Sequence, residues 1–266
     1  MLSGKRLLIS GVANRESIGA SVALQASKAG AEVIFAAFPR DLVGAKEVAE
    51  ECGGSVAVLG VDATSEQEMA ELEKEIRRCW GGLDGALHAI AFAPKPALGS
   101  ILDVPASAVQ AAFTTSVWTY AAFGSMLSRL AGTSGASLVG LDFDSTRAWP
   151  VYNWMGPCKA ALRSLNSYLA RDLAPAGIRA NLVAAGPLRT RAASGIPGFE
   201  TLVRSWERQA PLAWDVADAA PVAEAICFLL SDAARAITGE VLNVDGGMHA
   251  MATWLGDGSE MAAEPA

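Results

Sequence analysis

Tyr152 and Lys159 are the two residues whose types and spacing best suggest chemistry. They lie in the stretch "AWPVYNWMGPCK", residues 148–159, with six residues between them. In a helix, seven positions return to nearly the same face, with about 20° of drift and a rise of about 10.5 Å. A lysine ammonium favours an anionic oxygen nearby, and a phenol can donate a hydrogen bond or a proton to a developing oxyanion. The alternative is that Tyr152 is a packed aromatic residue and Lys159 a surface cation.

Pro157 stands between these two residues and bears on where their helix begins. A proline deep inside a helix costs about 3 kcal/mol, whereas a proline in the first turn costs little. If Tyr152 precedes the helix, Pro157 falls near the first turn and is harmless. If the helix begins earlier, we expect a kink beside Tyr152.

Short, β-rich apolar runs alternate with helical patterns along the whole chain. Strands are expected at residues 5–11, 31–38, 55–62, 83–92, 136–144, 177–187 and 239–247. Helices are expected at residues 17–29, 65–80, 106–130 and 217–230. Two more are expected, one from the end of the second strand to about residue 51 and one from the segment that holds Tyr152 to about residue 173. Ser65 and Glu68 form a capping-box pattern at the start of the third helix. Continuous apolar strands separated by helices predict a parallel sheet covered on both faces. We therefore predict an α/β fold: a single Rossmann-type, doubly wound parallel sheet of about seven strands.

Composition limits the classes of protein that fit. The 266 residues carry a formal net charge of −7, and 52% of them are hydrophobic, which suits one large core over residues 1–255. Residues 256–266 lose apolar periodicity and are predicted to form a flexible tail. The absence of a basic cluster argues against a nucleic-acid surface. The four cysteines are too far apart for a zinc site or a disulfide framework, so no metal is expected. Without a leader or an apolar run of about 20 residues, we expect no membrane association and a soluble, cytoplasmic protein.

The carboxyl ends of parallel strands are where such sheets bind ligands. The first end is "GVANRESIGA", residues 11–20, where a glycine leads into a helix. This arrangement lets the backbone approach a phosphate, with helix N–H groups facing it. The G-x-G-x-x-G spacing is absent, so a tight turn without a ligand is the alternative.

The second and third strand ends carry residues suited to an adenosine group. Phe38 can pack against the adenosine edge, or it can simply close the strand half-buried. Arg40 can serve a 2′-phosphate, so the residues alone leave the choice between NADH and NADPH open. Asp62 can accept a hydrogen bond from the adenine amino group, or it can cap the following helix.

The fourth strand ends in "HAIAFAPK", residues 88–95. Small side chains at Ala89 and Ala91 leave space for a flat ligand. His88 is expected to be an ordinary packed histidine.

Taken together, these residues resemble the short-chain dehydrogenase/reductase superfamily, whose more common members use Tyr-x-x-x-Lys. None of Tyr120, Tyr152 and Tyr168 has a lysine four places on. The Tyr-x6-Lys spacing and the first turn "GVANRESI" resemble the enoyl-acyl-carrier-protein reductases of type II fatty-acid synthesis, over about residues 2–247. The segments "LVGLDFDSTRAWPVYNWMGPCKAAL" and "GIRANLVAAGPLRT" look most like the actinobacterial, isoniazid-target branch, which has Phe at the position of Phe143.

This resemblance implies an NADH site and a catalytic group. The cofactor residues would be Gly11, Val12, Ala13, Ser17, Ile18, Phe38, Asp62, Ala63, Ala89, Ile90, Ala91, Lys159, Gly186, Pro187, Leu188 and Thr190. Tyr152 would face the thioester carbonyl, Lys159 would hold the nicotinamide ribose hydroxyls, and Phe143 would pack beside the reacting double bond. A second strand that ends in Phe38 without a pair of basic residues implies NADH rather than NADPH.

The implied reaction transfers hydride from NADH to the β-carbon of a trans-2-enoyl thioester and gives the saturated acyl thioester. The substrate would be carried by acyl carrier protein or coenzyme A, and the resemblance implies a homotetramer. Helices of a substrate loop are expected at about residues 190–210. The segment "TRAASGIPGFETLVRSW" is shorter than the loop of reductases that handle very long chains, so we expect a preference for short to medium chains.

Two alternatives remain open from the sequence. Ala89 and Ala91 stand where relatives often have Ser and Gly, which is compatible with a related reductase of a specialised acyl or polyketide pathway. A catalytically retired NAD(H)-binding protein is the second alternative, although both Tyr152 and Lys159 are present.

Overall fold

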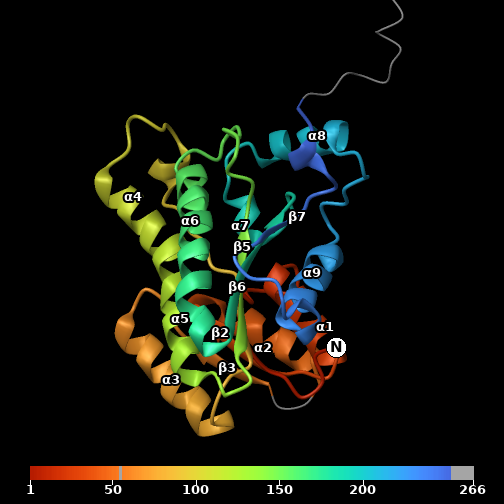
Figure 1. The fold of residues 1–266 in the computed structure, drawn as a ribbon. Helices are drawn as coiled ribbons and strands as arrows, with labels where there is room; N and C mark the ends of the chain where they lie inside the picture. Colours follow the sequence, from red (N-terminus) through yellow and green to blue (C-terminus); the bar gives the residue numbers. More distant parts are fainter. Residues whose placement is uncertain (54–55, 253–266) are drawn as a thin grey trace, which may run out of the picture.

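Seven parallel strands form the centre of the molecule in the computed structural model, which describes residues 1–53 and 56–252 (Figure 1). They are β1 (Arg6–Ser10), β2 (Glu32–Ala37), β3 (Ala57–Gly60), β4 (Gly85–His88), β5 (Ala136–Asp142), β6 (Ile178–Ala185) and β7 (Val241–Val244). Their order is β3-β2-β1-β4-β5-β6-β7, and every neighbouring pair is parallel. The strand order reverses direction between β1 and β4, which is the switch point of a doubly wound sheet. The predicted fold class is confirmed. The tail predicted at residues 256–266 lies outside the described residues.

Helices cover both faces of this sheet. One face packs against α1 (Ile18–Lys28), α2 (Leu42–Glu51) and α9 (Ala220–Leu230). The other packs against α3 (Glu66–Trp80), α5 (Thr119–Leu130) and α6 (Met155–Leu173). Successive strand side chains point to opposite faces, so Leu7 and Ile9 join the first core and Leu8 joins the second. Because both faces are buried, the strands are apolar without alternation, as the sequence suggested.

The long helix predicted at residues 106–130 is a continuous helical stretch with a change of pitch inside it. It consists of α4 (Ala106–Phe113), a π-helical turn at Thr114–Trp118, and α5. Two further helices, α7 (Arg191–Ser194) and α8 (Phe199–Gln209), lie within the segment where helices were expected near 190–210. Among the described helices, none combines the length and the apolar composition that crossing a bilayer requires.

The start of α3 shows half of the predicted capping box. The Ser65 side chain accepts a hydrogen bond from the backbone N–H of Glu68 at 3.3 Å, as a helix N-cap should. The Glu68 carboxylate does not reach back to Ser65. It accepts instead from the backbone N–H of Asp62 at 2.7 Å. This contact fixes the segment that leaves β3 rather than closing the helix end on itself.

A buried polar cluster joins α5, α6 and β6. The Tyr120 hydroxyl donates to Asn166 Oδ1 at 2.8 Å and lies 3.2 Å from the Asn181 carbonyl oxygen. All three residues are fully buried. A buried acceptor that loses its donor costs more than an average hydrogen bond contributes. The cluster is therefore expected to set the packing of these three elements.

Replacing Tyr120 with Phe should lower the free energy of unfolding by about 1–3 kcal/mol, because Asn166 Oδ1 loses its donor inside the core. Urea unfolding followed by circular dichroism measures the change. Tyr168→Phe is the matched control, since Tyr168 is 57% exposed and should change stability by less than about 0.5 kcal/mol. Equal effects of the two substitutions would contradict a structural role for the cluster.

Candidate active site

A cavity of about 880 Å³ runs along the carboxyl ends of the strands. Its wall includes the segments that directly follow β1, β2, β4, β5 and β6. The structure brings every residue predicted for the site to this one cavity. These residues are Gly11, Val12, Ala13, Ser17, Ile18, Phe38, Asp62, Ala63, Ala89, Ile90, Ala91, Phe143, Tyr152, Lys159, Gly186, Pro187, Leu188 and Thr190.

The turn after β1 has the geometry of a phosphate cradle. Gly11 has φ +72°, and a Cβ atom there would collide with the backbone oxygen of Ala89, so only glycine fits. Ser17 caps α1, whose N-terminal turn borders the cavity. Asn14 also borders it, and the side-chain oxygen of this residue is buried with no hydrogen-bond partner among the described residues. The close approach of the backbone and the helix N–H groups suit the pyrophosphate of a dinucleotide. The buried acceptor oxygen of Asn14 suits a hydroxyl of its ribose.

The opposite wall near β2 and β3 fits the adenosine half. Phe38 is 43% exposed, and the Arg40 guanidinium lies 4.9 Å from its ring centroid. Asp62 accepts from Thr64 at 2.9 Å through the backbone N–H and at 2.7 Å through the hydroxyl. Because Ser65 caps α3, the alternative in which Asp62 caps that helix is wrong. Asp62 instead shapes the turn that borders the cavity.

The position of Tyr152 corrects one expectation about the helix. The helix α6 begins at Met155, so Tyr152 lies before it, in a turn whose flanking residues Val151 and Asn153 have φ angles of 62° and 40°. The interpretation that Tyr152 and Lys159 lie on one face of a regular helix is therefore wrong. Pro157 is the third residue of α6, where its missing N–H leaves no helical hydrogen bond unmade. The harmless position for this proline is the observed one.

Lys159 is a buried cation at the end of β5. It is 4% exposed, which rules out the alternative of a surface lysine. Its ammonium donates a hydrogen bond to the Leu141 carbonyl oxygen at 2.7 Å. Burial lowers the pKa of Lys159, and the nearby Asp142 carboxylate raises it again. Tyr152 is 8% exposed, and burial with the negative charge of Asp142 raises the pKa of its phenol. One cavity thus holds a neutral phenol and a buried ammonium.

The ion pair between Asp142 and Arg163, which lies next to Lys159, was not predicted from the sequence. Arg163 Nε lies 2.6 Å from Asp142 Oδ2, and the Asp142 side chain is completely buried. Asp142 borders the cavity, and its Oδ1 atom is buried without a hydrogen-bond partner in the described part of the chain. Burial raises the pKa of Asp142, and the charges of Lys159 and Arg163 oppose that rise. Two sequence signals were available: a carboxylate at a strand end, and an arginine four positions after Lys159.

His88 is packed in the core beneath this group, as the sequence predicted. It is fully buried, with its ring edge-on to Tyr120 and Phe123, and its Nε2 lies 2.8 Å from the Thr119 hydroxyl. Burial and the charge of Lys159 lower the pKa of His88 to about 3. The histidine is neutral near pH 7 and carries no charge into the site.

Aromatic rings close the apolar end of the cavity. The Phe143 ring centroid lies 4.7 Å from that of Tyr152 and 5.7 Å from that of Trp206. Trp149 packs 4.8 Å from Trp206 and donates a hydrogen bond to Asp144 at 3.1 Å. Trp149 and Trp206 were not singled out from the sequence. Their rings pack against Phe143, with centroid distances of 5.8 and 5.7 Å.

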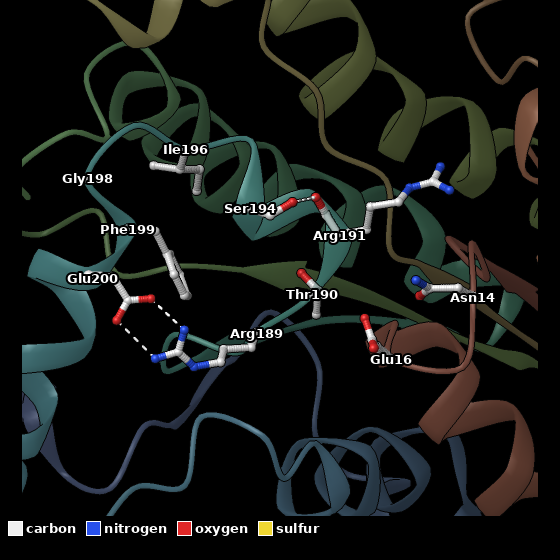
Figure 2. Close-up of a pocket in the computed structure, with 10 residues that line it drawn as sticks. All are labelled: Asn14, Glu16, Arg189, Thr190, Arg191, Ser194, Ile196, Gly198, Phe199 and Glu200. Carbon is white, nitrogen blue, oxygen red and sulfur yellow. Dashed lines mark hydrogen bonds and ion pairs between the residues drawn. The ribbon is translucent and has the colours of Figure 1, made fainter.

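A second hollow of about 720 Å³ adjoins the cavity between the first turn and the α7–α8 segment (Figure 2). Figure 2 shows Arg189 and Glu200 paired at its wall, with hydrogen bonds of 2.5 and 2.9 Å between them. Arg191 extends away from that pair and forms an ion pair with Asp41, in the segment after β2. These two ion pairs hold α7 and α8 against the rest of the cavity rim.

Comparison with known proteins agrees with this geometry. The family described as "Enoyl-(Acyl carrier protein) reductase" matches residues 11–249. The NADH enoyl-acyl-carrier-protein reductase of Mycolicibacterium smegmatis is 37% identical to this chain, covering 93% of the chain and 97% of that protein. The enzyme of the same name from Mycobacterium avium is 34% identical, with the same coverage of 93% and 97%. The FabI reductase of Aquifex aeolicus is 36% identical, covering 94% of this chain and 93% of that protein. The chain therefore belongs to the enoyl-acyl-carrier-protein reductase family of the short-chain dehydrogenases/reductases.

Proposed function

We propose that this protein is an NADH-dependent enoyl-acyl-carrier-protein reductase. The observation that carries the proposal is the joint placement of Tyr152 and the buried Lys159 at a strand-end cavity that fits a dinucleotide. The relatives from M. smegmatis, M. avium and A. aeolicus are all named as NADH enoyl-acyl-carrier-protein reductases, at coverage above nine-tenths of both chains. The substrate is a trans-2-enoyl thioester on an acyl carrier protein, and the product is the saturated acyl thioester.

Residues at both ends of the cavity would hold NADH, which supplies the hydride for the β-carbon of the substrate. The turn at Gly11 and the N-terminus of α1 suit the pyrophosphate, and Phe38 and Asp62 suit the adenosine. Lys159 suits the nicotinamide ribose, because a buried ammonium can donate to hydroxyl oxygens while keeping its bond to Leu141.

Tyr152 has the properties of an oxyanion stabiliser. Its phenol is neutral, since burial raises its pKa, and it makes no hydrogen bond to other described residues. It can therefore donate to the thioester oxygen as negative charge moves there during reduction of the double bond. The positive charge of Lys159 favours the same oxygen, and the dry surroundings strengthen both interactions. Phe143 packs against the Tyr152 ring and gives the double bond a flat apolar surface.

The apolar end of the cavity favours short to medium acyl chains. Phe143 packs against Trp149 and Trp206, and the segment from Thr190 to Trp206 contains only the short helix α7 and most of α8. Trp206 is 1% exposed and donates to the Asp245 carbonyl oxygen at 3.0 Å, so α8 is anchored over this end. A wall held in this way leaves little room for a very long chain.

The proposal also covers the domain organisation of the protein and its oligomeric state. Residues 1–255 act as one dinucleotide-binding and catalytic domain, with the helices near 190–210 as its substrate loop. Assembly into a homotetramer and a location in the cytoplasm stay predictions. Size-exclusion chromatography with light scattering would decide the oligomeric state.

Changing Tyr152 to Phe should reduce kcat about 100-fold, because the oxygen that gains charge loses its donor. The dissociation constant for NADH, followed by nucleotide fluorescence, should stay within about twofold. Tyr168→Phe, on the exposed face of α6, is the matched control and should leave kcat unchanged. Undiminished turnover in the Tyr152 variant would remove this residue from the mechanism.

Replacing Asp142 with Asn should move the alkaline limb of the kcat/KM profile to lower pH. Lys159 is charged below its pKa, burial already lowers that pKa, and Asp142 is the main group that raises it. Without the carboxylate the ammonium loses its proton at lower pH, and activity falls with it. Arg163→Gln is the opposite-sign control, because the Arg163 charge lowers the pKa of Lys159 and its loss should move the limb upward. Shifts in the same direction would contradict this electrostatic assignment.

Rates with enoyl thioesters of increasing length test the function and the chain preference together. NADH and NADPH oxidation should be followed with butenoyl, octenoyl, dodecenoyl and hexadecenoyl thioesters. We expect NADH to be preferred and kcat/KM to peak at short or medium length. A steady rise toward the longest chain would contradict the preference, and no oxidation with any chain would contradict the function itself.

A further inference from the structure

The residues on both sides of Tyr152 adopt a backbone conformation that L-amino acids rarely choose. Val151 has φ 62° and Asn153 has φ 40°. A β-branched residue with positive φ is an outlier, whereas asparagine is one of the few side chains enriched there. Such a conformation persists only where surrounding contacts hold it in place. The turn that carries Tyr152 therefore depends on contacts outside itself.

The Asn153 side chain supplies the most direct of these contacts. Its amide Nδ2 donates to the Leu98 carbonyl oxygen at 2.9 Å and also to the Gly99 carbonyl oxygen. Leu98 ends a short 3₁₀ turn, Lys95–Leu98, in the segment after β4, and Gly99 is the residue that directly follows this turn. Asn153 therefore joins the Tyr152 turn to a segment more than fifty residues earlier in the chain.

The next residue strengthens the same junction. The Trp154 backbone N–H donates to the Ala97 carbonyl oxygen at 3.3 Å, and its indole N–H donates to the Ile101 carbonyl oxygen at 3.2 Å. The helix α6 begins only at Met155, so these bonds lie outside the helix. They fix the point at which the chain enters α6.

The junction joins two sides of the cavity. Leu98 borders the cavity and packs with Phe143 and Tyr152 in one apolar cluster. Asn153 itself does not line the cavity. A shift of the Asn153 amide would move the Tyr152 ring and the Leu98 wall relative to each other, and an error of about 1 Å at a catalytic group is costly for the rate.

We propose that Asn153 is a positioning residue for Tyr152, which uses its two amide N–H donors to hold the Tyr152 turn against the Leu98–Gly99 carbonyls. The proposal rests on the proposed function in one respect, that the Tyr152 hydroxyl acts in enoyl reduction. A competing explanation is that asparagine is present only because it tolerates positive φ. Glycine tolerates positive φ better and has no amide, so it separates the two explanations.

The first experiment compares Asn153→Gly and Asn153→Asp with the wild-type protein. Glycine keeps the backbone conformation, and aspartate keeps the shape, but neither can donate to the two carbonyls. Both variants should lose at least about tenfold in kcat, while the dissociation constant for NADH stays within twofold. Tyr120→Phe is the control for a general loss of stability, because Tyr120 lies outside the cavity lining, and its kcat well below the melting temperature should stay unchanged. Unchanged kcat in Asn153→Gly would overturn the proposal.

The second experiment repeats Asn153→Gly in the Tyr152→Phe background. A residue that acts through the Tyr152 hydroxyl has nothing left to position once that hydroxyl is gone, so the further loss in kcat should be below twofold. An equal tenfold loss in both backgrounds would show that Asn153 acts elsewhere and would overturn the proposal.

Hydrogen–deuterium exchange gives a readout that needs no turnover. The Tyr152, Met155 and Gly156 amides bond within the turn, so a peptide covering residues 149–156 should exchange at least fivefold faster in Asn153→Gly. Unchanged exchange would overturn the proposal that Asn153 holds the Tyr152 turn in place. Failure of the proposed function is seen separately, because wild-type protein would then oxidise no NADH with any enoyl thioester, and the catalytic part of this proposal would fall with it.

Discussion

The buried ammonium of Lys159 is the constraint on which the arrangement of the site depends. A charge taken out of water is costly unless it is paired and hydrogen-bonded. Here the Leu141 carbonyl oxygen accepts from it at the end of β5, and the Asp142 carboxylate lies next to that carbonyl. These partners fix α6 against the carboxyl end of β5. Arg163, one turn further along α6, joins this helix to β5 a second time through its ion pair with Asp142. The position of α6 in turn determines where the preceding turn, and therefore Tyr152, can lie.

The strands and their faces could be predicted because burial on both sides leaves a plain apolar signal. The strand ends were less predictable, and the fourth strand shows why. Apolar residues continue to Phe92, yet β4 ends at His88. Residues 89–92 leave the sheet and line the cavity, so their apolar side chains form a ligand surface rather than pairing as a strand. The same holds for Phe143 after β5 and for Gly186 and Pro187 after β6. Periodicity cannot separate these two reasons for being apolar.

Contacts between distant segments account for what the sequence did not reveal about the site. The residue types at Ser65 and Glu68 were right for a capping box, but a backbone N–H of Asp62 competes for the Glu68 carboxylate. The competitor exists only because β3 delivers the chain to that place. In the same way, Asp142 and Arg163 are 21 positions apart, and no local rule connects them. Gly11, Phe38, Asp62 and Ala89 were predictable because the strand ends of a doubly wound sheet must meet at one edge. The cavity residues after β6 were implied only by the family resemblance.

The turn before α6 also explains why the spacing between Tyr152 and Lys159 is seven. In a continuous helix, seven positions separate two residues by about 10.5 Å along the axis. Only the four steps from Met155 to Lys159 are helical here, and they account for about 6 Å of rise. The left-handed residues at positions 151 and 153 turn the chain aside before that point, so Tyr152 leaves the helix axis and can pack against Phe143. Pro157 suits this arrangement, because its ring is tolerated in a first turn and would clash with a helix that began before Tyr152. The proline that looked disruptive in the sequence therefore favours the helix start that the tyrosine needs.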